Sequence, residues 1–534
     1  MKTKFTIIFF IIILLNIDIQ ANTYYVAKNG NDANQGTEAQ AWLTIQKAAN
    51  TLVAGDTVFI KAGTYNERII VQNSGTADNY IVFLNYQNDT VIIDGTGISW
   101  GGAWNGLFDL SDKSYIEIKG LQIKNADYAG IWAENSNYIL IKENYTYNTF
   151  SSGIGIWNCS YVQVENNEVE LACNDGEQEC ITIANSHHCN VLKNNVHDNG
   201  AGTEGGEGID VKAGSHDVNV YQNEVHHLNN RLGIYADAWD TLTYNINIYQ
   251  NIVHHCTETG LAVASESGGL IENVNIFNNI IYFNQYGGIE LGSWSDIGFT
   301  GKKPIEHIKI INNTCYKNGA YNDGWGFGIV IDNPDAKDVV IRNNICSENS
   351  AQIAIQQIDS GGLVDHNLLY GNNTASGTVY GTDSITENPL FQDTVNFDFH
   401  LLNNSPAIDK GSAADAPDFD FDNNQRPLGS GFDMGAYEYT SPSSIQNNSN
   451  PVDFIKIYPN PVSDKLNIKI EGNEYQNYTL QLLDINGKLM KNVIINRLKE
   501  DLISIETKDF VSGIYILNIF TDNKLILNRK LIIE

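Results

Sequence analysis

Short segments in which apolar and polar residues alternate run through most of the chain. Examples are Tyr115-Ile116-Glu117-Ile118 and Val340-Ile341-Arg342, and Gly, Asn or Asp bounds each segment. Alternation with a period of two residues predicts β-strands, because successive side chains of a strand point to opposite faces. From about residue 73 to 400 these segments follow one another closely, so this region is expected to consist of short strands and tight turns.

Asparagine recurs in this region at a fixed spacing of 28 residues. A repeat of roughly 20–50 residues is the signature of a solenoid, in which each coil buries its apolar face against its neighbours. A coil of this length has room for three short strands, each rising roughly 3.3 Å per residue, and for the turns between them. Stacking the coils would bring the Asn side chains into a hydrogen-bonded ladder. We therefore predict an all-β fold, a right-handed parallel β-helix, whose ladder contains Asn167, Asn195, Asn223, Asn251 and Asn279.

Composition divides the chain into five parts. The first is a secretory signal, because Lys2 and Lys4 precede an apolar stretch that ends before the small residue Ala21. Apolar residues with helical spacing between residues 43 and 52 predict a helix in a cap that covers the end of the solenoid. The expected parts are a signal peptide (1–21), an N-terminal cap (22–72), the β-helix with a C-terminal capping segment (73–440), a linker (441–452) and a small β-sandwich (453–534).

The net charge of −31 argues against a nucleic-acid partner, because phosphate binding needs a basic stripe. Seven cysteines are scattered without the spacing of a metal site. Cys173 and Cys180 are close enough in sequence to form a disulfide, whereas the others are expected to pack inside the coils as small apolar residues. We expect the protein to be a monomer.

Aligning the central coils places apolar residues at the second and fourth positions of each strand, so these side chains point inward. The third and fifth positions then form two outward columns. The first column contains Gly155, Thr182, Asp210, Tyr235, Ala262 and Glu290, and the second contains Trp157, Ala184, Lys212, Asp237, Ala264 and Gly292.

Charged residues gather in the middle of these columns. Asp210, Lys212 and Asp237 belong to adjacent coils, about 4.8 Å apart, and Glu179 and Glu207 stand at the strand entries. Carboxylates this close repel one another unless a cation lies among them or some take up protons. Oxygen ligands on a rigid frame suit Ca²⁺. The alternative is that these are ordinary solvated charges on an exposed sheet.

Aromatic and further acidic residues flank this cluster. The aromatic side chains either stack on sugar rings along a groove or cover loops against the solenoid. The candidate substrate-binding residues are Trp157, Tyr235, Trp239, Glu266 and Glu290. A separate set of histidines repeats at the coil spacing, and we expect its members to stack on one another rather than to ligate a metal: His197, His226, His227, His254 and His255.

Several short motifs near the C-terminus stand out from the rest of the chain. They are Tyr458-Pro459-Asn460-Pro461-Val462, Leu483-Asp484-Ile485-Asn486-Gly487-Lys488, Ser512-Gly513-Ile514-Tyr515 and Lys530-Leu531. With these motifs, the C-terminal part resembles the type IX secretion C-terminal sorting domain. The resemblance implies export by the type IX secretion machinery across the outer membrane of a Gram-negative bacterium, followed by release or anchoring at the outer surface.

Two central segments, 206–212 (GEGIDVK) and 234–240 (IYADAWD), are rich in acidic residues. The first is similar to the part of the family-six polysaccharide lyases in which acidic calcium ligands precede a catalytic lysine. The second resembles the calcium-binding coil of the family-nine pectate lyases. The chain departs from both patterns. Residues 260–264 (GLAVA) stand where the family-nine lysine lies, and Asp237 stands where the family-six arginine is expected.

These resemblances imply a set of site residues and a cofactor. Glu207, Asp210, Asp237 and Asp240 would hold Ca²⁺. Lys212 would be the catalytic base, with Asp210 and Arg231 as its catalytic neighbours. A lysine beside Ca²⁺ has its ammonium form disfavoured, so Lys212 is expected to act as a base near neutral pH.

Three functions follow from the sequence. The first is a secreted, calcium-dependent lyase that cleaves an acidic, uronate-containing polysaccharide by β-elimination. The second is a β-helix glycoside hydrolase that uses two carboxyl groups, either Glu207 with Asp237 or Asp210 with Glu290. The third is a surface protein without catalytic activity that uses the β-helix as a spacer or to bind carbohydrate.

Overall fold

The computed structural model describes residues 21–440 and 455–533, with gaps at 175–177, 202–204, 295–297, 320–325, 350–352, 357–361, 372–378, 459–461, 463, 485–487, 509 and 522–523. The expected signal peptide, apart from Ala21, and the expected linker lie outside these residues. Within the described part of the chain, no helix has the length and hydropathy needed to cross a membrane. The chain forms two compact units, residues 1–439 and residues 440–534, and each is described by itself.

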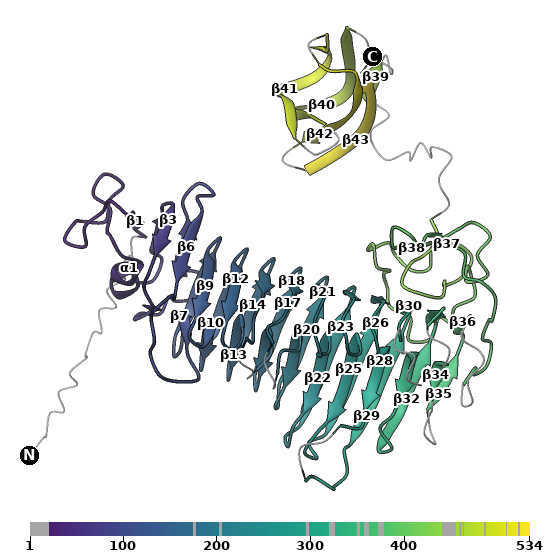
Figure 1. The fold of residues 1–534 in the computed structure, drawn as a ribbon. Helices are drawn as coiled ribbons and strands as arrows, with labels where there is room; N and C mark the ends of the chain where they lie inside the picture. The colour runs from purple at the N-terminus through teal and green to yellow at the C-terminus, as the bar shows by residue number, and fades with distance from the viewer. Residues whose placement is uncertain are drawn as a thin grey trace, which may run out of the picture. The chain divides into compact units, whose positions relative to one another are not determined.

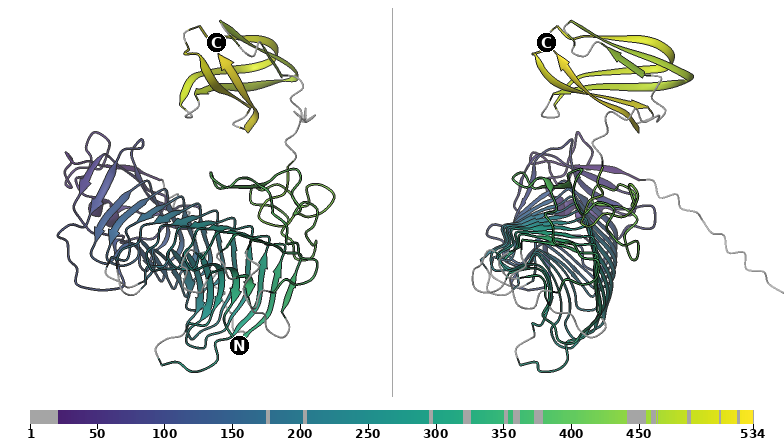
Figure 2. Two further views of the ribbon diagram at one scale, coloured as in Figure 1. Left: turned by 45° about the vertical axis from the view of Figure 1, so that its right-hand side comes forward. Right: turned by 90° about the vertical axis from the view of Figure 1, so that its right-hand side faces the viewer.

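The first unit is a solenoid in which three parallel β-sheets run along its length (Figure 1). The chain visits the sheets in turn, so each strand pairs with the strand one coil further on. Viewed along the solenoid axis, the strands of each sheet lie over one another (Figure 2). The observed architecture confirms the predicted parallel β-helix.

In the described residues the three sheets contain 13, 11 and 12 strands. The 13-stranded sheet consists of β1 (Thr23–Val26), β2 (Thr57–Ile60), β5 (Ile81–Asn85), β8 (Ser114–Lys119), β11 (Asn137–Lys142), β14 (Ser160–Glu165), β17 (His187–Leu192), β20 (His216–Tyr221), β23 (Thr243–Tyr249), β26 (Ile271–Phe277), β29 (Ile305–Ile311), β32 (Ala336–Arg342) and β35 (Leu363–Asp365). The 11-stranded sheet consists of β4 (Ile69–Ile70), β7 (Gly106–Asp109), β10 (Ala129–Glu134), β13 (Ile154–Trp157), β16 (Ile181–Ala184), β19 (Ile209–Lys212), β22 (Ile234–Ala238), β25 (Leu261–Ser265), β28 (Gly287–Gly292), β31 (Phe327–Ile331) and β34 (Ile353–Gln356). The 12-stranded sheet consists of β3 (Gly63–Tyr65), β6 (Val91–Asp94), β9 (Gln122–Ala126), β12 (Tyr145–Thr149), β15 (Glu168–Glu170), β18 (Asn195–His197), β21 (Glu224–His226), β24 (Ile252–His254), β27 (Ile280–Tyr282), β30 (Thr314–Tyr316), β33 (Ile345–Ser347) and β36 (Leu368–Tyr370).

The corner between the 13-stranded and 12-stranded sheets carries the asparagine ladder. Oδ1 of Asn251 accepts hydrogen bonds from the backbone N–H and the side-chain amide of Asn223, both at 3.0 Å. The amide of Asn251 in turn donates to Val220 O at 2.9 Å and to Oδ1 of Asn279 at 3.0 Å. The preceding residue, Gln250, has a φ of 53°, so the chain turns in the left-handed region at this corner. Each ladder residue therefore satisfies backbone groups that a tight buried turn would otherwise leave unpaired.

The prediction was wrong for one member of the ladder. Between Asn167 and Asn223 the ladder residue is Asn194, whereas Asn195 begins the next strand. The two steps span 27 and 29 residues instead of 28 each, because the corner of the coil, and not the count of residues, positions the side chain. A second, shorter ladder that the sequence analysis did not identify joins Asn284, Asn318 and Asn349.

The interior of the solenoid is filled by the inward-pointing apolar positions of all three sheets. These form one continuous core, in which residues such as Ile154, Ile181, Ile209 and Ile234 are fully buried. All seven cysteines are buried and none forms a disulfide, so Cys173 and Cys180 are not joined in this structure. All seven belong to this core, as small apolar residues do.

A short helix, α1 (Ile45–Thr51), closes the N-terminal end of the core. It begins after Thr44, whose hydroxyl accepts a hydrogen bond from the backbone N–H of Lys47 at 3.1 Å, as an N-cap residue does. Its buried side chains pack against the first coils, where they cover apolar surface that would otherwise face water. The helix predicted between residues 43 and 52 is therefore confirmed.

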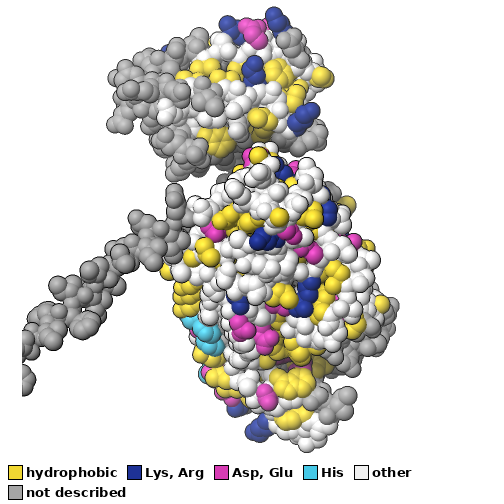
Figure 3. Space-filling model, turned by 90° about the vertical axis from the view of Figure 1, so that its left-hand side faces the viewer, with side chains coloured by type: hydrophobic (Ala, Val, Ile, Leu, Met, Phe, Trp, Pro, Cys, Tyr) yellow, Lys and Arg dark blue, Asp and Glu magenta, His cyan; other side chains and the backbone are white. Residues whose placement is uncertain are grey.

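The repeating histidines stack on one another, as predicted. His197 lies over His226 and His226 over His254, with ring centroids 4.9 Å apart in each pair. His227 and His255 form a second stack at 5.1 Å. Histidine side chains gather in one patch on the surface seen in Figure 3.

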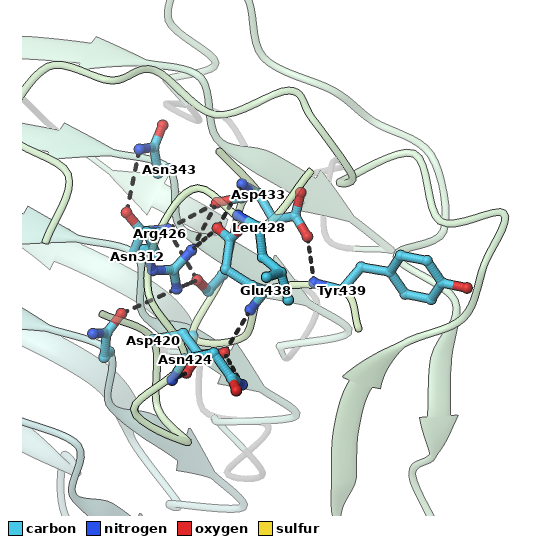
Figure 4. Close-up of polar contacts among 12 residues, drawn as sticks. Asn312, Asn343, Asp420, Asn424, Arg426, Leu428, Asp433, Glu438 and Tyr439 are labelled. Atoms are coloured by element: carbon cyan, nitrogen blue, oxygen red, sulfur yellow. Dashed lines mark hydrogen bonds and ion pairs between the residues drawn. The ribbon is translucent and has the colours of Figure 1, made fainter. Parts of the chain in front are cut away.

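The segment that follows the last coil folds back against the side of the solenoid. It contains a small antiparallel pair, β37 (Phe391–Asp393) and β38 (Asp398–Leu401). Further along, a buried polar network fastens the segment (Figure 4). In this network Arg426 donates to Glu438 at 2.6 Å and to Oδ1 of the coil residue Asn278 at 3.1 Å. Asp420 accepts hydrogen bonds from the backbone N–H groups of Asn424 and Glu438, so this carboxylate stabilises the turn itself.

The second unit is a small antiparallel β-structure with its own core. Its strands are β39 (Ile455–Tyr458), β40 (Lys465–Asp484), β41 (Leu489–Glu506), β42 (Gly513–Thr521) and β43 (Lys524–Ile533). Buried residues including Leu480, Leu517 and Leu531 pack together between these strands.

Candidate active site

A cleft of about 380 Å³ lies on the outer side of the 11-stranded sheet, at its central coils. Side chains from β13, β19 and β22 form its floor, and residues that follow β22 and β25 form part of its rim. The described residues that line it are Trp157, Gln178, Glu179, Gly205, Glu207, Asp210, Lys212, Ala213, Tyr235, Asp237, Trp239 and Glu266.

The two outward columns are formed as predicted. In the first column Thr182 pairs with Asp210, and Asp210 pairs with Tyr235. In the second column Ala184 pairs with Lys212. The side chains are not solvated, however, because Asp210 is 1% exposed and Asp237 is 4% exposed. The alternative of ordinary surface charges on an open sheet therefore does not describe these carboxylates.

Lys212 is held on the cleft floor by carboxylates. Its Nζ lies 2.5 Å from Oε1 of Glu179 and 3.8 Å from Oδ2 of Asp210. The other oxygen of Glu179, Oε2, accepts a hydrogen bond of 2.9 Å from the hydroxyl of Thr182. The ring centroid of Trp157 lies 6.0 Å from Nζ of Lys212. Glu179 is thus the direct partner of Lys212. The sequence analysis had placed Glu179 only at a strand entry.

Burial and mutual repulsion raise the pKa values of the cleft acids. Burial, with the charge of Glu179 nearby, raises the pKa of Glu207 to about 7. Burial and the charge of Asp237 raise the pKa of Asp210 well above its ordinary value. Burial and the charge of Glu266 have the same effect on the pKa of Asp237. The cleft therefore disfavours the ionised form of these acids unless a positive charge lies among them.

The pKa of Lys212 is shifted in the opposite direction from the expectation. Burial acts to lower this pKa, but the carboxylates of Glu179, Asp210 and Asp237 outweigh burial and raise it. Without a cation among these acids, Lys212 is an ammonium ion at neutral pH. The expectation of a neutral lysine rested on Ca²⁺, and the carboxylates alone have the reverse effect.

Two buried oxygen atoms in the cleft fit a cation. Oδ1 of Asp210 and Oδ1 of Asp237 have no hydrogen-bond partner among the described residues. A buried carboxylate oxygen without a partner is costly, and a hard cation with oxygen ligands removes that cost. The tightest group of possible ligands in the described chain lies elsewhere, at Glu168, Glu170 and His197, with ligand atoms within 4.8 Å of one another. The cleft acids are more widely spaced, so water or a substrate oxygen would have to complete the coordination of an ion there.

The cleft brings together most of the candidate residues. Tyr235 is buried, and its hydroxyl donates to Oε1 of Glu266 at 2.5 Å. Trp157 lies at the floor, and Trp239, which is 42% exposed, lies at the rim. A second cavity of about 300 Å³ shares Glu207, Tyr235 and Glu266 with the cleft.

Three candidate residues lie away from the cleft floor. Arg231 lines the second cavity, where its Nε lies 4.0 Å from Oε1 of Glu207. Asp240 is exposed, two residues beyond the end of β22, and does not line the cleft. Glu290 is buried and accepts a hydrogen bond of 2.8 Å from Thr259, three coils from Asp210 in the same column.

Some residues of the site escaped the sequence analysis. Gln178 and Gly205 line the cleft from segments that precede the strands. Trp104 packs against Trp157 from the long loop between β6 and β7, at a centroid distance of 4.9 Å. Glu179 and Glu207 are 28 residues apart, so the coil repeat could have shown that Glu179 lies next to Glu207 on the adjacent coil. No signal in the sequence places Trp104, because the loops that join the 12-stranded to the 11-stranded sheet do not repeat its sequence from coil to coil.

Comparisons with known proteins agree with this architecture. Residues 24–229 match the Pel9A-like, right-handed β-helix region, and residues 203–303 match the general right-handed β-helix region. Residues 456–534 match the secretion system C-terminal sorting domain. The chain thus combines a right-handed β-helix, which is Pel9A-like over residues 24–229, with a type IX secretion C-terminal sorting domain. It is a protein that Gram-negative bacteria secrete or attach to their outer surface.

Curated relatives cover part of the chain. It is 36% identical over 129 residues to the uncharacterized protein YwoF of Bacillus subtilis, across 23% of this chain and 28% of that protein. It is 29% identical over 146 residues to the pectate lyase PEL9 of Emericella nidulans, across 25% of this chain and 35% of that enzyme. The matched segments therefore span about a third of the length of these relatives.

Two solved structures resemble this chain over most of its length. The structure of XylC in complex with xylose has a TM-score of 0.50 and 13% identity, and the match covers 78% of this chain and 99% of that chain. The pectate lyase Pel9A has a TM-score of 0.48 and 15% identity, and the match covers 78% and 96% of the two chains. The likeness to XylC, at 13% identity, concerns the fold alone.

Proposed function

We propose that this protein is a polysaccharide lyase that cleaves a uronate-containing polysaccharide by β-elimination, with Lys212 as the base. The observation that carries the proposal is the position of Lys212 on the cleft floor, beside the unpaired Oδ1 atoms of the buried Asp210 and Asp237. The relationship to the pectate lyase PEL9 supports the same reaction class.

The reaction requires one proton to leave the sugar and another to reach the leaving group. In β-elimination the C5–H bond of the uronate breaks, its electron pair forms the C4–C5 double bond, and the C4–O bond breaks. As a neutral amine, Nζ of Lys212 takes the C5 proton. Tyr235 lies one coil away in the column of Asp210, and its hydroxyl is the group that returns a proton to the leaving oxygen. Burial and the charges of Asp237 and Glu266 raise the pKa of this phenol, so it keeps its proton until the transfer.

Asp210, Asp237 and Glu207 are the residues that would hold Ca²⁺. Bound there, the ion would supply positive charge that pairs with the uronate carboxylate and stabilises the charge that develops on the sugar. Lys212 must lose its proton before it can act as a base. Neutralising Asp210 and Asp237 removes two of the three carboxylates that hold this proton.

The test is to follow the ultraviolet absorbance of the unsaturated uronate product with pectate, alginate, chondroitin and ulvan, in calcium and in chelator. The expected result is a calcium-dependent rise that Lys212→Ala lowers by at least about 100-fold, the usual contribution of a general base. Lys337→Ala is the matched control, because Lys337 pairs with Glu306 on the exposed surface. Full activity of the Lys212→Ala variant would refute the assignment of the base.

A glycoside hydrolase is the second candidate, because the pKa of Glu207 is raised to about 7. A carboxyl group with such a pKa suits a general acid at neutral pH, and Asp237 lines the same cleft as a possible partner. The pair of Asp210 and Glu290 is unsuitable, because three coil steps place these residues about 14 Å apart. New reducing ends without ultraviolet absorbance, lost in Glu207→Gln, would favour the hydrolase. Neither signal on any of the polymers would favour a binding protein.

A further inference from the structure

The cleft is continued toward the N-terminal coils by a group of aromatic side chains. We call this group the aromatic shelf; it consists of Trp104, Tyr128, Trp132 and Trp157. Trp157 belongs to the outward column of Lys212, two coils before it, and lines the cleft. Trp104 lies edge-on to Trp157 at 4.9 Å and is 46% exposed. The shelf and the cleft are therefore one continuous surface.

The shelf holds polar groups without partners. The indole N–H groups of Trp132 and Trp157 donate to no acceptor among the described residues. Trp132 is fully buried, beneath Trp104 at a centroid distance of 6.0 Å. Buried indole N–H groups usually find an acceptor. Trp132 supports the rings above it, and the partly exposed rings of Trp157 and Trp104 offer flat apolar faces on which a sugar stacks.

The two cations recorded beside the shelf, Arg68 and Lys212, are already paired with carboxylates. Glu134 is the register partner of Trp157, and Asp109 is the register partner of Trp132. Arg68 stacks on Trp100 in the same loop as Trp104, but it is bound to Asp109 at 2.9 Å. A uronate carboxylate on the shelf would face Glu134 and would find Arg68 already paired with Asp109, whereas a neutral sugar would carry no charge for Glu134 to repel.

We propose that the substrate is a heteropolysaccharide in which uronate residues are linked to neutral sugars. The uronate binds at Lys212, Asp210 and Asp237, and a neutral sugar stacks on Trp157 and Trp104. Nζ of Lys212 lies 6.0 Å from the ring centroid of Trp157, so a sugar on Trp157 would be the direct neighbour of the uronate at Lys212. This inference rests on the proposed lyase function and adds the class of polymer.

Binding to the full-length Lys212→Ala variant tests the inference without cleavage. Isothermal titration in calcium compares two sets of size-matched oligosaccharides. The first set comes from the rhamnogalacturonan backbone and from desulfated ulvan, in which uronate alternates with a neutral deoxyhexose. The second set consists of oligogalacturonates and oligoalginates, which contain uronate alone. We expect the mixed set to bind at least about tenfold more tightly.

Second substitutions locate the effect on the shelf. Trp104→Ala is expected to weaken binding of the mixed set by about tenfold and to leave binding of the uronate set nearly unchanged. Trp157→Ala, which also alters the cleft floor, is expected to weaken binding of the mixed set more than binding of the uronate set. Tyr161→Ala is the control, because Tyr161 is also an exposed aromatic residue in a stack, but on β14 of the 13-stranded sheet. Circular dichroism of each variant checks that the β-helix is intact.

The outcomes separate this inference from the function on which it rests. The proposal of a heteropolymer substrate is overturned if the uronate set binds equally or more tightly. It is also overturned if neither tryptophan substitution changes binding of the mixed set. If those binding results are accompanied by unsaturated products that the wild-type protein forms from pectate or alginate, the lyase assignment is kept and only the heteropolymer proposal is lost. Tight, shelf-dependent binding of the mixed set without unsaturated product supports the heteropolymer and overturns the lyase.

Discussion

Nζ of Lys212 lies 2.5 Å from Oε1 of Glu179, closer than to any other carboxylate recorded for it in the described chain. Glu179 comes from the coil before that of Lys212 and is itself fixed by the hydroxyl of Thr182. The ion pair is buried, with side-chain exposures of 17% for the lysine and 6% for the glutamate. The partner of the candidate base therefore sets how readily it can lose its proton.

Glu179→Gln is expected to shift the pH dependence of activity to lower pH. The charge of Glu179 raises the pKa of Lys212, so its removal lowers that pKa and makes the neutral amine available in less alkaline solution. A shift of about one unit corresponds to about 1.4 kcal/mol. The measurement is the rising limb of kcat/KM against pH. Glu306→Gln, which breaks the surface pair with Lys337, is the control, and an unchanged limb in Glu179→Gln would contradict the role of Lys212.

Asp237→Asn is expected to abolish stabilisation by calcium. The substitution removes one of the two buried carboxylates whose Oδ1 atom has no partner in the described structure. For the wild type, calcium at 100 times its dissociation constant should stabilise the fold by about 2.7 kcal/mol. The measurement is the Tm in calcium and in chelator. Asp240→Asn should keep the full increase of Tm in calcium, since Asp240 is exposed and outside the cleft. Loss of this increase in Asp240→Asn would show that Asp240 is a calcium ligand after all.

The histidine stack is expected to make the solenoid less stable in acid. Burial, together with His254 and His197, lowers the pKa of His226 from 6.5 to about 4. Below pH 6.5 the unfolded chain takes up a proton that the folded chain refuses until about pH 4. This residue therefore lowers stability as the pH falls through that window.

His226→Gln tests this effect by urea unfolding at pH 7 and at pH 4.5. The loss of unfolding free energy between the two pH values should be smaller in the variant by about 1–2 kcal/mol, after allowance for partial exposure of the ring. His307→Gln is the control, because the His307 side chain is 50% exposed. An equal loss in wild type and His226→Gln would show that other groups cause the acid sensitivity.

Asn251→Ala is expected to destabilise the solenoid by about 3–5 kcal/mol, since it leaves the backbone N–H of Asn223 and the carbonyl of Val220 without this partner in a buried corner. Asn247→Ala is the matched control on the same coil. Asn247 also belongs to a chain of amide hydrogen bonds, with Asn219 and Asn275, but on the half-buried outer face. Its loss should cost less than about 1 kcal/mol. Similar losses in the two variants, measured by chemical unfolding, would contradict a special role for the corner ladder.

The pattern of apolar and polar residues predicted the fold and the outward columns of the site. Both depend on two regular spacings in the sequence, the two-residue alternation of a strand and the repeat of the coil. Alternation along each strand separates inward from outward residues, and the coil repeat stacks Asp210 on Thr182 and beneath Tyr235. The ladder shows the limit of counting, since Asn194 and not Asn195 occupies the corner. A shift of one residue leaves the spacing almost unchanged but places the side chain in a strand.

The composition of the cleft was less predictable. Glu290 lies in the same column as Asp210, yet three coils away, and Asp240 leaves the strand and becomes exposed. The loops between the strands differ in length from coil to coil. They decide which residues near the strand ends line the cleft. The loop that brings Trp104 against Trp157 is one of these, and it contains no repeat.

By itself, the sequence determined the β-helix, the capping helix, the export domain and the two outward columns, because strand alternation, coil period and short motifs are local properties of the chain. Only the tertiary structure decided that the carboxylates of Asp210 and Asp237 are buried, that Glu179 holds Lys212, and that Trp104 extends the cleft. Burial and ion pairing depend on what covers a residue and on which coil lies beside it. Those neighbours come from distant parts of the chain, so their effect on charge and pKa appears only once the coils are stacked.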